Sequence, residues 1–189
     1  MFIEYFLVII VYIFFFLCLW IGKKIFIILI IFKIFDILGP PQFLRKAVQG
    51  KSKKFFAHIS KKYGDCPNII YEIYNEPLEV SWSEVLKPYH TQIIKAIRKN
   101  DSNNIIVCGT PSWSQRIDEA LKDPIPEENV AYTLHFYADT HRQELRDLAE
   151  KAIAGGLPIF VTEYGTTDAS GDGIVNEEQT KIWWKLLDN

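Results

Sequence analysis

Cysteine and an excess of basic charge are both lacking in this sequence of 189 residues. The three cysteines, Cys18, Cys66 and Cys108, form an odd set without CxxC spacing, which excludes a disulfide scaffold and a CxxC metal site. A formal net charge of −2 argues against a protein that binds nucleic acid through phosphate contacts, so we expect no nucleic-acid partner. The length suits one globular domain.

Small and polar residues are almost absent from residues 1–38. The segment contains no Ala, Ser, Thr, Pro, Asn or Gln and a single glycine, and its only charges are Glu4, Lys23, Lys24, Lys33 and Asp36. Residues 39–189 carry all the other charges and have the composition of a soluble globular protein. We therefore divide the chain into an apolar segment, 1–38, and a globular domain, 39–189.

Three interpretations of the apolar segment stay open. As a membrane anchor, Tyr5–Ile21 reaches the lower limit for a spanning helix. The lysines that follow it would keep the domain in the cytosol, unless Ile25–Phe32 forms a second, short span. A secretory signal fits less well, because Glu4 stands where a basic residue is expected and no small-residue cleavage site follows.

The third interpretation is a gene-model artefact, in which AT-rich non-coding DNA has been translated. Natural spanning helices use small residues where they pack against one another, and this segment has almost none. It is dominated instead by residue types whose codons can consist of A and T alone, such as Ile, Phe and Lys. If the segment is protein, a membrane would be contacted through residues 5–38.

Residues 39–189 alternate between helical and strand patterns. We predict helices over Phe43–Tyr63, Trp82–Asn100, Ser114–Lys122, Thr140–Ala154 and Glu177–Leu187, and strands over Ile69–Tyr74, Asn104–Thr110, Val130–Tyr137 and Pro158–Thr162. Such alternation indicates an α/β fold with parallel strands and crossover helices. The strand ends are spaced much like the units of a (β/α)8 barrel, about 31 residues each. No GxGxxG or Walker loop follows a strand, which disfavours a nucleotide-binding sheet.

Two glutamates stand where predicted strands end. Asn75-Glu76-Pro77 follows the first strand, and Glu163 follows the fourth. The carboxyl ends of barrel strands lie on one face, which holds the active site, so these carboxylates are expected to converge. Paired carboxylates about 5–5.5 Å apart perform retaining glycoside hydrolysis, in which one attacks the sugar and the other donates a proton.

The motifs YEIYNEP, YTLHFYADTH and PIFVTEYGTTDASGDG resemble those of glycoside hydrolase family 5. More narrowly, they resemble endo-β-1,4-glucanases of the bacterial and plant-parasitic-nematode type, over about Ala47 to Leu187. The resemblance implies a (β/α)8 TIM barrel, cellulose breakdown by a retaining mechanism, no metal or cofactor, and secretion. Location at a membrane is the alternative if the apolar segment is real.

The resemblance also implies roles for individual residues. Glu76 would be the general acid/base and Glu163 the nucleophile. Asn75 would bind the sugar 2-hydroxyl, Tyr137 would hold Glu163, and His135 would lie beside Glu76.

Other polar and aromatic residues are interpreted from their positions alone. Trp113 follows the second strand and is a candidate platform for the apolar face of a sugar ring. His141 opens the helix after Tyr137, a position from which it could line the cleft. We interpret Trp183 and Trp184 as packing residues.

The chain also departs from the family pattern. The first three strands of the family should precede residue 40, with an arginine and a histidine of the cleft, and the eighth should follow the last residue. We therefore expect a partial barrel of about four strands, the fourth to the seventh. The expected substrate is a β-1,4-glucan and the expected state a monomer. A non-catalytic truncated remnant, or a hydrolase of mannan or xylan, are the alternatives.

Overall fold

The computed structural model describes residues 28–31 and 42–188. Within these ranges the chain forms one sheet of five parallel strands in the order β1-β2-β3-β4-β5. The strands are β1 (Ile28–Ile31), β2 (Ile69–Glu72), β3 (Ile105–Cys108), β4 (Val130–Tyr137) and β5 (Ile159–Gly165). The helices are α1 (Gln42–Tyr63), a π-helical turn η1 (Trp82–Leu86), α2 (Lys87–Arg98), α3 (Pro111–Ser114), α4 (Ile117–Lys122), α5 (Gln143–Ala154) and α6 (Glu177–Leu187).

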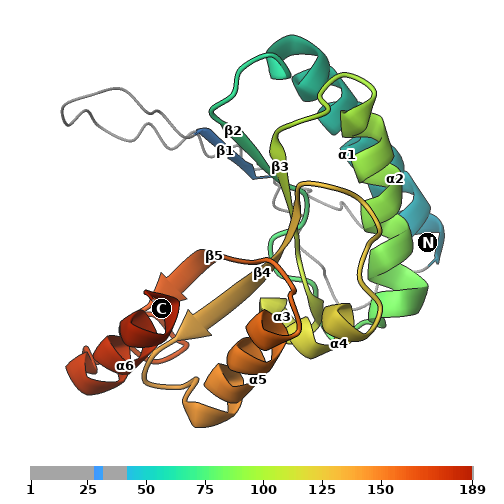
Figure 1. Cartoon of the computed structure of the whole chain (residues 1–189). Coiled ribbons are helices and arrows are strands. Elements are labelled where there is room, and N and C mark those ends of the chain that lie inside the picture. Colours follow the sequence, from blue (N-terminus) through green and yellow to red (C-terminus); the bar gives the residue numbers. More distant parts are fainter. Residues whose placement is uncertain (1–27, 32–41, 189) are drawn as a thin grey trace.

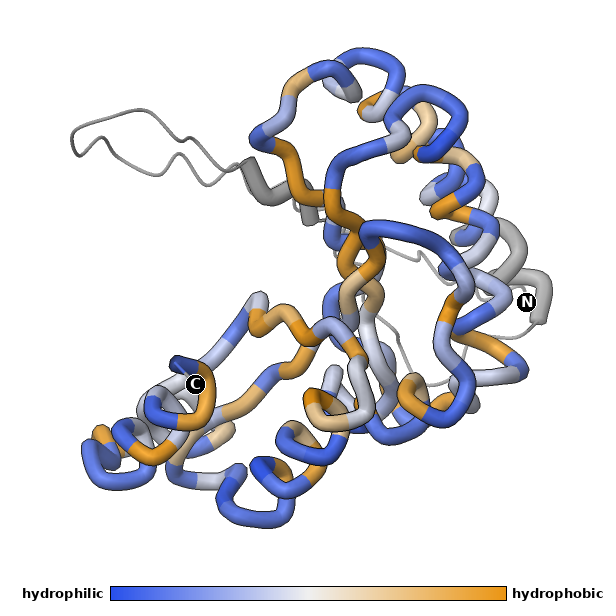
Figure 2. Tube along the Cα trace, in the orientation of Figure 1, coloured by the Kyte–Doolittle hydropathy of each residue, from blue (hydrophilic) through white to orange (hydrophobic). Residues whose placement is uncertain are grey.

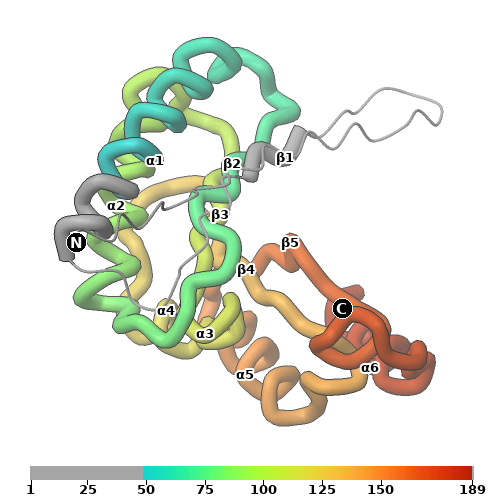
Figure 3. The backbone as a smooth tube through the Cα atoms, turned by 180° about the vertical axis from the view of Figure 1, so that it is seen from behind, coloured from blue at the N-terminus to red at the C-terminus, as the bar shows by residue number. Residues whose placement is uncertain are grey.

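Strand order in the sheet follows strand order in the sequence, as in a barrel wall. A doubly wound sheet would instead reverse direction at a switch point. The sheet curves strongly, with α1, α2, α4 and α5 on its convex side (Figures 1 and 3). The curvature brings the Thr162 hydroxyl on β5 to 2.8 Å from a carboxylate oxygen of Glu72 on β2, although β3 and β4 separate these strands. The described part of the chain is therefore a section of a (β/α) barrel, as predicted.

The four strands predicted from the sequence correspond to β2–β5, and β1 is an addition to them. It pairs in register with β2, from Ile28 opposite Ile69 to Ile31 opposite Glu72. This differs from the short membrane span considered for Ile25–Phe32, since its central residues form a strand. The Tyr5–Ile21 run lies outside the described residues. Among helices of the described ranges, none has both the length and the apolar run needed to cross a bilayer.

The helices predicted to begin at Trp82 and at Thr140 have other bounds in the structure. The segment expected as one helix, Trp82–Asn100, is divided into η1 and α2, and Pro88 lies in the first turn of α2, where its missing N–H breaks no helical bond. The helix expected to begin at Thr140 begins at Gln143, so His141 precedes α5 rather than opening it.

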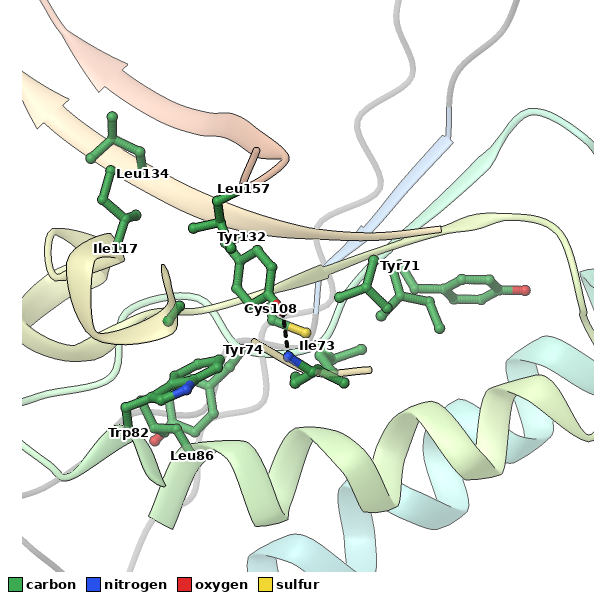
Figure 4. Packing of buried hydrophobic residues seen from close by; sticks show 14 of the residues in the cluster. Tyr71, Ile73, Tyr74, Trp82, Leu86, Cys108, Ile117, Tyr132, Leu134 and Leu157 are labelled. Carbon is green, nitrogen blue, oxygen red and sulfur yellow. Dashed lines mark hydrogen bonds between the residues drawn. The ribbon is translucent and has the colours of Figure 1, made fainter. Parts of the chain in front are cut away.

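The two faces of the sheet bury different sets of residues, because side chains alternate along each strand. The convex face packs on the helices and forms the main core, which includes Tyr71, Ile73, Cys108, Tyr132 and Phe136. Figure 4 shows part of this core, including Tyr132, between the sheet and α2. The Ile125 N–H donates to the Tyr132 hydroxyl at 2.7 Å. The concave face carries a small apolar cluster formed by Ile70, Val107, Ala131 and Phe160.

Helix α2 shows why this packing forms. Tyr89, His90, Ile93, Ile94 and Ile97 recur at helical spacing and are buried, while Lys95 is exposed on the opposite side. Each fully buried isoleucine contributes about 1.5–3 kcal/mol relative to an exposed one. Figure 2 shows apolar residues concentrated in the strands, whereas apolar and hydrophilic residues alternate along the helices.

Candidate active site

Three side chains converge near the carboxyl ends of the strands. Glu163 lies inside β5, which continues to Gly165, rather than after the strand as predicted. One carboxylate oxygen of Glu76, one of Glu163 and one ring nitrogen of His135 all lie within 4.8 Å of one another. Glu76 comes from the loop after β2, His135 from β4 and Glu163 from β5. The predicted convergence of the two glutamates is thus present in the structure, although many residues separate them in the sequence.

A β-bulge turns Glu163 toward the concave face. Thr133 pairs with Phe160, but His135, two residues further along β4, pairs with Glu163, three residues further along β5. The extra residue in β5 shifts the alternation of side chains by one position. Without it, a strand whose Phe160 and Thr162 face inward would direct Glu163 toward the helices.

Tyr137 holds the Glu163 carboxylate. Its hydroxyl donates a hydrogen bond of 2.9 Å to Glu163 Oε1. Burial, followed by this hydrogen bond and the negative charges of Glu163 and Glu76, raises the pKa of Tyr137 to about 12. The phenol therefore remains protonated, and able to donate, throughout the ordinary pH range.

Gly165 makes room for the Tyr137 ring. A Cβ atom at this position would lie 2.3 Å from Cδ1 of the ring, closer than any tolerated contact. This glycine was not singled out from the sequence, although the Tyr-Gly pair that follows Glu163 was the available signal. Any larger residue would displace the tyrosine from the carboxylate.

His135 contacts Glu76 as the family resemblance implied. Its Nδ1 atom lies 3.0 Å from Glu76 Oε1. The imidazole is almost completely buried, with 2% of its side chain exposed, whereas 27% of the Glu76 side chain is exposed. Glu76 is therefore supported from behind by a buried ring and faces the open side of the site.

The loop carrying Trp113 is attached to the loop carrying Glu76. The backbone N–H of Trp113 donates to the Pro77 carbonyl at 2.8 Å, and the Ser114 hydroxyl donates to the Asn75 carbonyl at 2.8 Å. Trp113 is 45% exposed, while Asn75 is partly buried next to Glu76. The exposed Trp113 thus belongs to a segment that is bonded to the residues on either side of Glu76.

Three consecutive residues of α3, the short segment that carries Trp113, have left-handed backbone conformations, so α3 is an irregular turn rather than a regular helix. The φ angles are 54° at Ser112, 56° at Trp113 and 59° at Ser114. Each such non-glycine residue costs about 1–2 kcal/mol, and strain of this kind is concentrated at functional sites. The helix predicted from Ser114 starts only at Ile117, since this left-handed turn precedes it.

His141 lies outside the group formed by Glu76, His135 and Glu163. Its Nδ1 atom accepts a hydrogen bond of 2.8 Å from the Tyr137 N–H, and its carbonyl accepts one of 2.7 Å from Trp183 Nε1. Burial lowers the pKa of His141, so the ring is neutral at neutral pH. The structure shows it bracing the end of β4 from which Tyr137 projects.

Two carboxylates and an imidazole are also a donor set that could hold a divalent cation. In the structure, however, Oε1 of Glu76 is bonded to His135 and Oε1 of Glu163 to Tyr137. The second ring nitrogen of His135 is bonded to Thr162. This arrangement orients a pair of carboxyl groups through hydrogen bonds and is suited to acid–base and nucleophilic chemistry.

Comparisons with known proteins identify the family of the chain. The family model described as cellulase, glycosyl hydrolase family 5, matches residues 43–189. Endoglucanase Z of Dickeya dadantii is 55% identical over 130 residues, which are 69% of this chain and 30% of that protein.

Solved structures agree as well. A structure from Cytophaga hutchinsonii is 52% identical, with a TM-score of 0.73, and the match covers 74% of this chain and 46% of that one. A variant of the Thermobifida fusca endoglucanase Cel5A catalytic domain, in complex with cellotetraose, is 30% identical with a TM-score of 0.75, covering 85% and 52%. The chain thus spans about a third of the curated relative and about half of these structures. It belongs to glycosyl hydrolase family 5, the cellulase family.

Proposed function

We propose that this chain carries the catalytic glutamates of a retaining endo-β-1,4-glucanase, with Glu163 as the nucleophile and Glu76 as the acid/base. The observation that supports this most directly is the placement of one oxygen of each carboxylate within 4.8 Å of the other and of His135. Such proximity suits a double displacement. An inverting enzyme needs about 6.5–9.5 Å between its carboxyl groups to admit a water molecule.

The reaction proceeds in two balanced steps. In the first, the Glu163 carboxylate attacks the anomeric carbon and the glycosidic bond breaks, while protonated Glu76 gives its proton to the leaving oxygen. In the second, ionised Glu76 takes a proton from water, which displaces Glu163 from the glycosyl ester and restores both groups. Tyr137 donates to Glu163, which favours the ionised form that attack requires.

The proposed substrate is a chain of β-1,4-linked glucose. The cellotetraose complex of the Thermobifida relative supports this choice. Asn75, beside Glu76, is the proposed partner of the sugar 2-hydroxyl, and the exposed Trp113 ring is the proposed surface for a sugar face. In this proposal His135 supports Glu76 from behind, Tyr137 holds Glu163, and His141 braces the backbone at Tyr137.

The proposed arrangement treats residues 39–189 as part of the catalytic domain and 1–38 as a separate segment. Because a glucan polymer is found outside cells, we propose that the enzyme acts there. No metal or cofactor enters the proposed mechanism.

Hydrolysis by the full chain tests the function. We expect release of reducing ends from carboxymethylcellulose and cleavage of a fluorogenic cellotetraoside, both abolished by Glu163→Gln. Glu178→Gln is the matched control, because Glu178 is exposed on α6, away from the site. Undiminished hydrolysis by the Glu163→Gln variant would refute the assignment.

Covalent trapping identifies the nucleophile without requiring turnover. A 2-deoxy-2-fluoro-cellobiosyl fluoride should add one glycosyl group, and peptide mass spectrometry should place it on Glu163. Parallel assays with mannan and xylan distinguish the other β-glycans. A folded chain that is neither labelled nor able to cleave any of the three polymers would be the non-catalytic remnant instead.

A further inference from the structure

A buried hydrogen-bond network of polar side chains lies behind the candidate active site on the concave face. Glu72, the last residue of β2, and Thr133 on β4 are fully buried, and His135 is 2% exposed. Thr162 on β5 connects them. Its Oγ1 atom lies 2.8 Å from Glu72 Oε1, 2.7 Å from Thr133 Oγ1 and 2.8 Å from His135 Nε2.

The hydrogen atoms in this network have one arrangement that is consistent with the donor role of Thr162. A hydroxyl group donates one hydrogen bond and accepts two. The Thr162 hydroxyl donates its one hydrogen to Oε1 of Glu72. Thr162 must then accept from its two other neighbours, so Thr133 donates through its hydroxyl and His135 donates through Nε2–H.

We propose that Glu72 is a positioning residue that acts through the Thr162 hydroxyl to hold His135 in the Nε2–H tautomer. The Nδ1 atom, 3.0 Å from Glu76 Oε1, is then left as an acceptor facing that carboxyl group. This inference rests on the proposed function of Glu76 and adds to it a reason why the acid/base keeps its proton.

The tautomer matters for the acid/base step. With Nδ1 as an acceptor and the ring neutral, the bond between His135 and Glu76 requires the proton to reside on Glu76, the form that donates to a leaving group. With the opposite tautomer, His135 would donate to Glu76 and favour its ionised form.

The charged and titratable groups around this ring come from three strands and one loop. Glu72 comes from β2, where its Oε1 atom lies 3.9 Å from Nε2, and Glu76 from the loop after it. Glu163 approaches from β5 and Tyr137 projects from β4. Of these groups, Glu72 is connected to Nε2 through a hydroxyl and Glu76 is bonded to Nδ1, so they act on opposite sides of the ring.

Nitrogen NMR of the histidine-labelled full chain measures the tautomer directly. Two of the four histidines provide internal references, because backbone groups fix their tautomers. His90 Nε2 donates to the Gly109 carbonyl at 2.8 Å, and His141 Nδ1 accepts from the Tyr137 N–H at 2.8 Å. Burial lowers the pKa of both, to about 4 for His90, so both rings are neutral Nε2–H forms at neutral pH.

We expect His135 in the wild-type chain to give the Nε2–H pattern of these references. Thr162→Val removes the connecting hydroxyl. Glu72→Gln supplies an amide that can donate to Thr162 and so reverse the donor and acceptor roles along the network. Each should lower the ratio of Nε2–H to Nδ1–H forms about tenfold, equivalent to about 1.4 kcal/mol, the order of one hydrogen bond. Thr162→Ser retains the hydroxyl and should restore the wild-type ratio.

The references also report whether each variant is folded, since the His90 and His141 signals should stay unchanged. An Nδ1–H form of His135 in the wild type would overturn the proposal. So would a wild-type His135 spectrum in the Thr162→Val chain with both references intact.

A second readout separates this inference from the proposed function. In hydrolysis assays, Glu72→Gln and Thr162→Val should move the basic limb of the pH–rate profile to lower pH, because the acid form of Glu76 is then lost earlier. Thr162→Ser should return the limb toward its wild-type position. If the wild type cleaves no glycan yet shows the expected tautomer, the proposed function fails and the positioning by Glu72 stands.

Discussion

Replacing Tyr137 with phenylalanine removes the 2.9 Å hydrogen bond to Glu163 while leaving the ring in place. A hydrogen bond to a charged group contributes about 1.5–3 kcal/mol. Because about 1.36 kcal/mol corresponds to one pH unit, the acidic limb of the pH–rate profile should move upward by about one to two units. The direction follows from the mechanism, since attack requires an ionised carboxylate and the lost donor favours ionisation.

The Tyr137 hydroxyl should also affect the stability of the fold at high pH. Its pKa, raised to about 12 in the folded chain, lies above the ordinary value of 10. The stability that this group contributes is therefore fully present below pH 10 and is lost as the pH rises through about 12. In the Tyr137→Phe variant this alkaline loss should be smaller than in the wild type, as measured by urea unfolding at increasing pH, and the remainder belongs to other tyrosines such as Tyr132, whose pKa is also raised to about 12.

The assay for the acidic limb is kcat/KM for a fluorogenic cellotetraoside from acidic to neutral pH, repeated as the rate of covalent trapping. Tyr164→Phe is the matched control. Tyr164 follows Glu163 in β5, and its ring stacks on Phe136 at 5.3 Å between centroids, on the helix-facing side of the sheet. An unshifted acidic limb in folded Tyr137→Phe, or an equal shift in the control, would refute the role given to the tyrosine hydroxyl.

Three further predictions concern stability and binding. Asp101→Ala should lower the free energy of unfolding by about 2–4 kcal/mol, because the buried carboxylate accepts from the Tyr71 hydroxyl at 2.7 Å and from two backbone N–H groups. Burial acts to raise the pKa of Asp101, but its hydrogen bonds outweigh burial and the pKa lies below the ordinary value of 3.8. Urea titrations should therefore show the stabilisation by Asp101 in full above pH 3.8 and its loss as the pH falls through the lowered pKa. Trp183→Ala should lower the free energy of unfolding by about 3–5 kcal/mol in the same titrations, because the ring is fully buried and stacked on Phe136. Trp184→Ala, at a 45% exposed position, should change it by less than about 0.5 kcal/mol. Equal losses in the two variants would contradict this packing. Trp113→Ala should raise KM for the cellotetraoside about tenfold, consistent with about 1.4 kcal/mol of ring contact, and an unchanged KM would exclude the platform role.

Local pattern was sufficient to predict most of the elements. Short apolar runs bounded by turn residues correspond to β2–β5, and the amphipathic stripe of Tyr89, Ile93 and Ile97 corresponds to α2. The errors occurred where an element depends on its surroundings. Ile28–Ile31 is as apolar as a membrane segment and becomes a strand through pairing with β2. His141 fits a helical pattern, but its ring accepts from the Tyr137 backbone and it remains outside α5.

The sequence by itself determined the alternation of strands and helices, and with it the placement of Glu76 and Glu163 at strand ends. These features depend on residue type and spacing, which are local. Only the tertiary structure decided that the bulge in β5 turns Glu163 inward and that the curved sheet brings Glu72 to Thr162 across two intervening strands. Register and curvature are properties of neighbouring strands acting together, so no single stretch of sequence encodes which buried carboxylate stands behind His135.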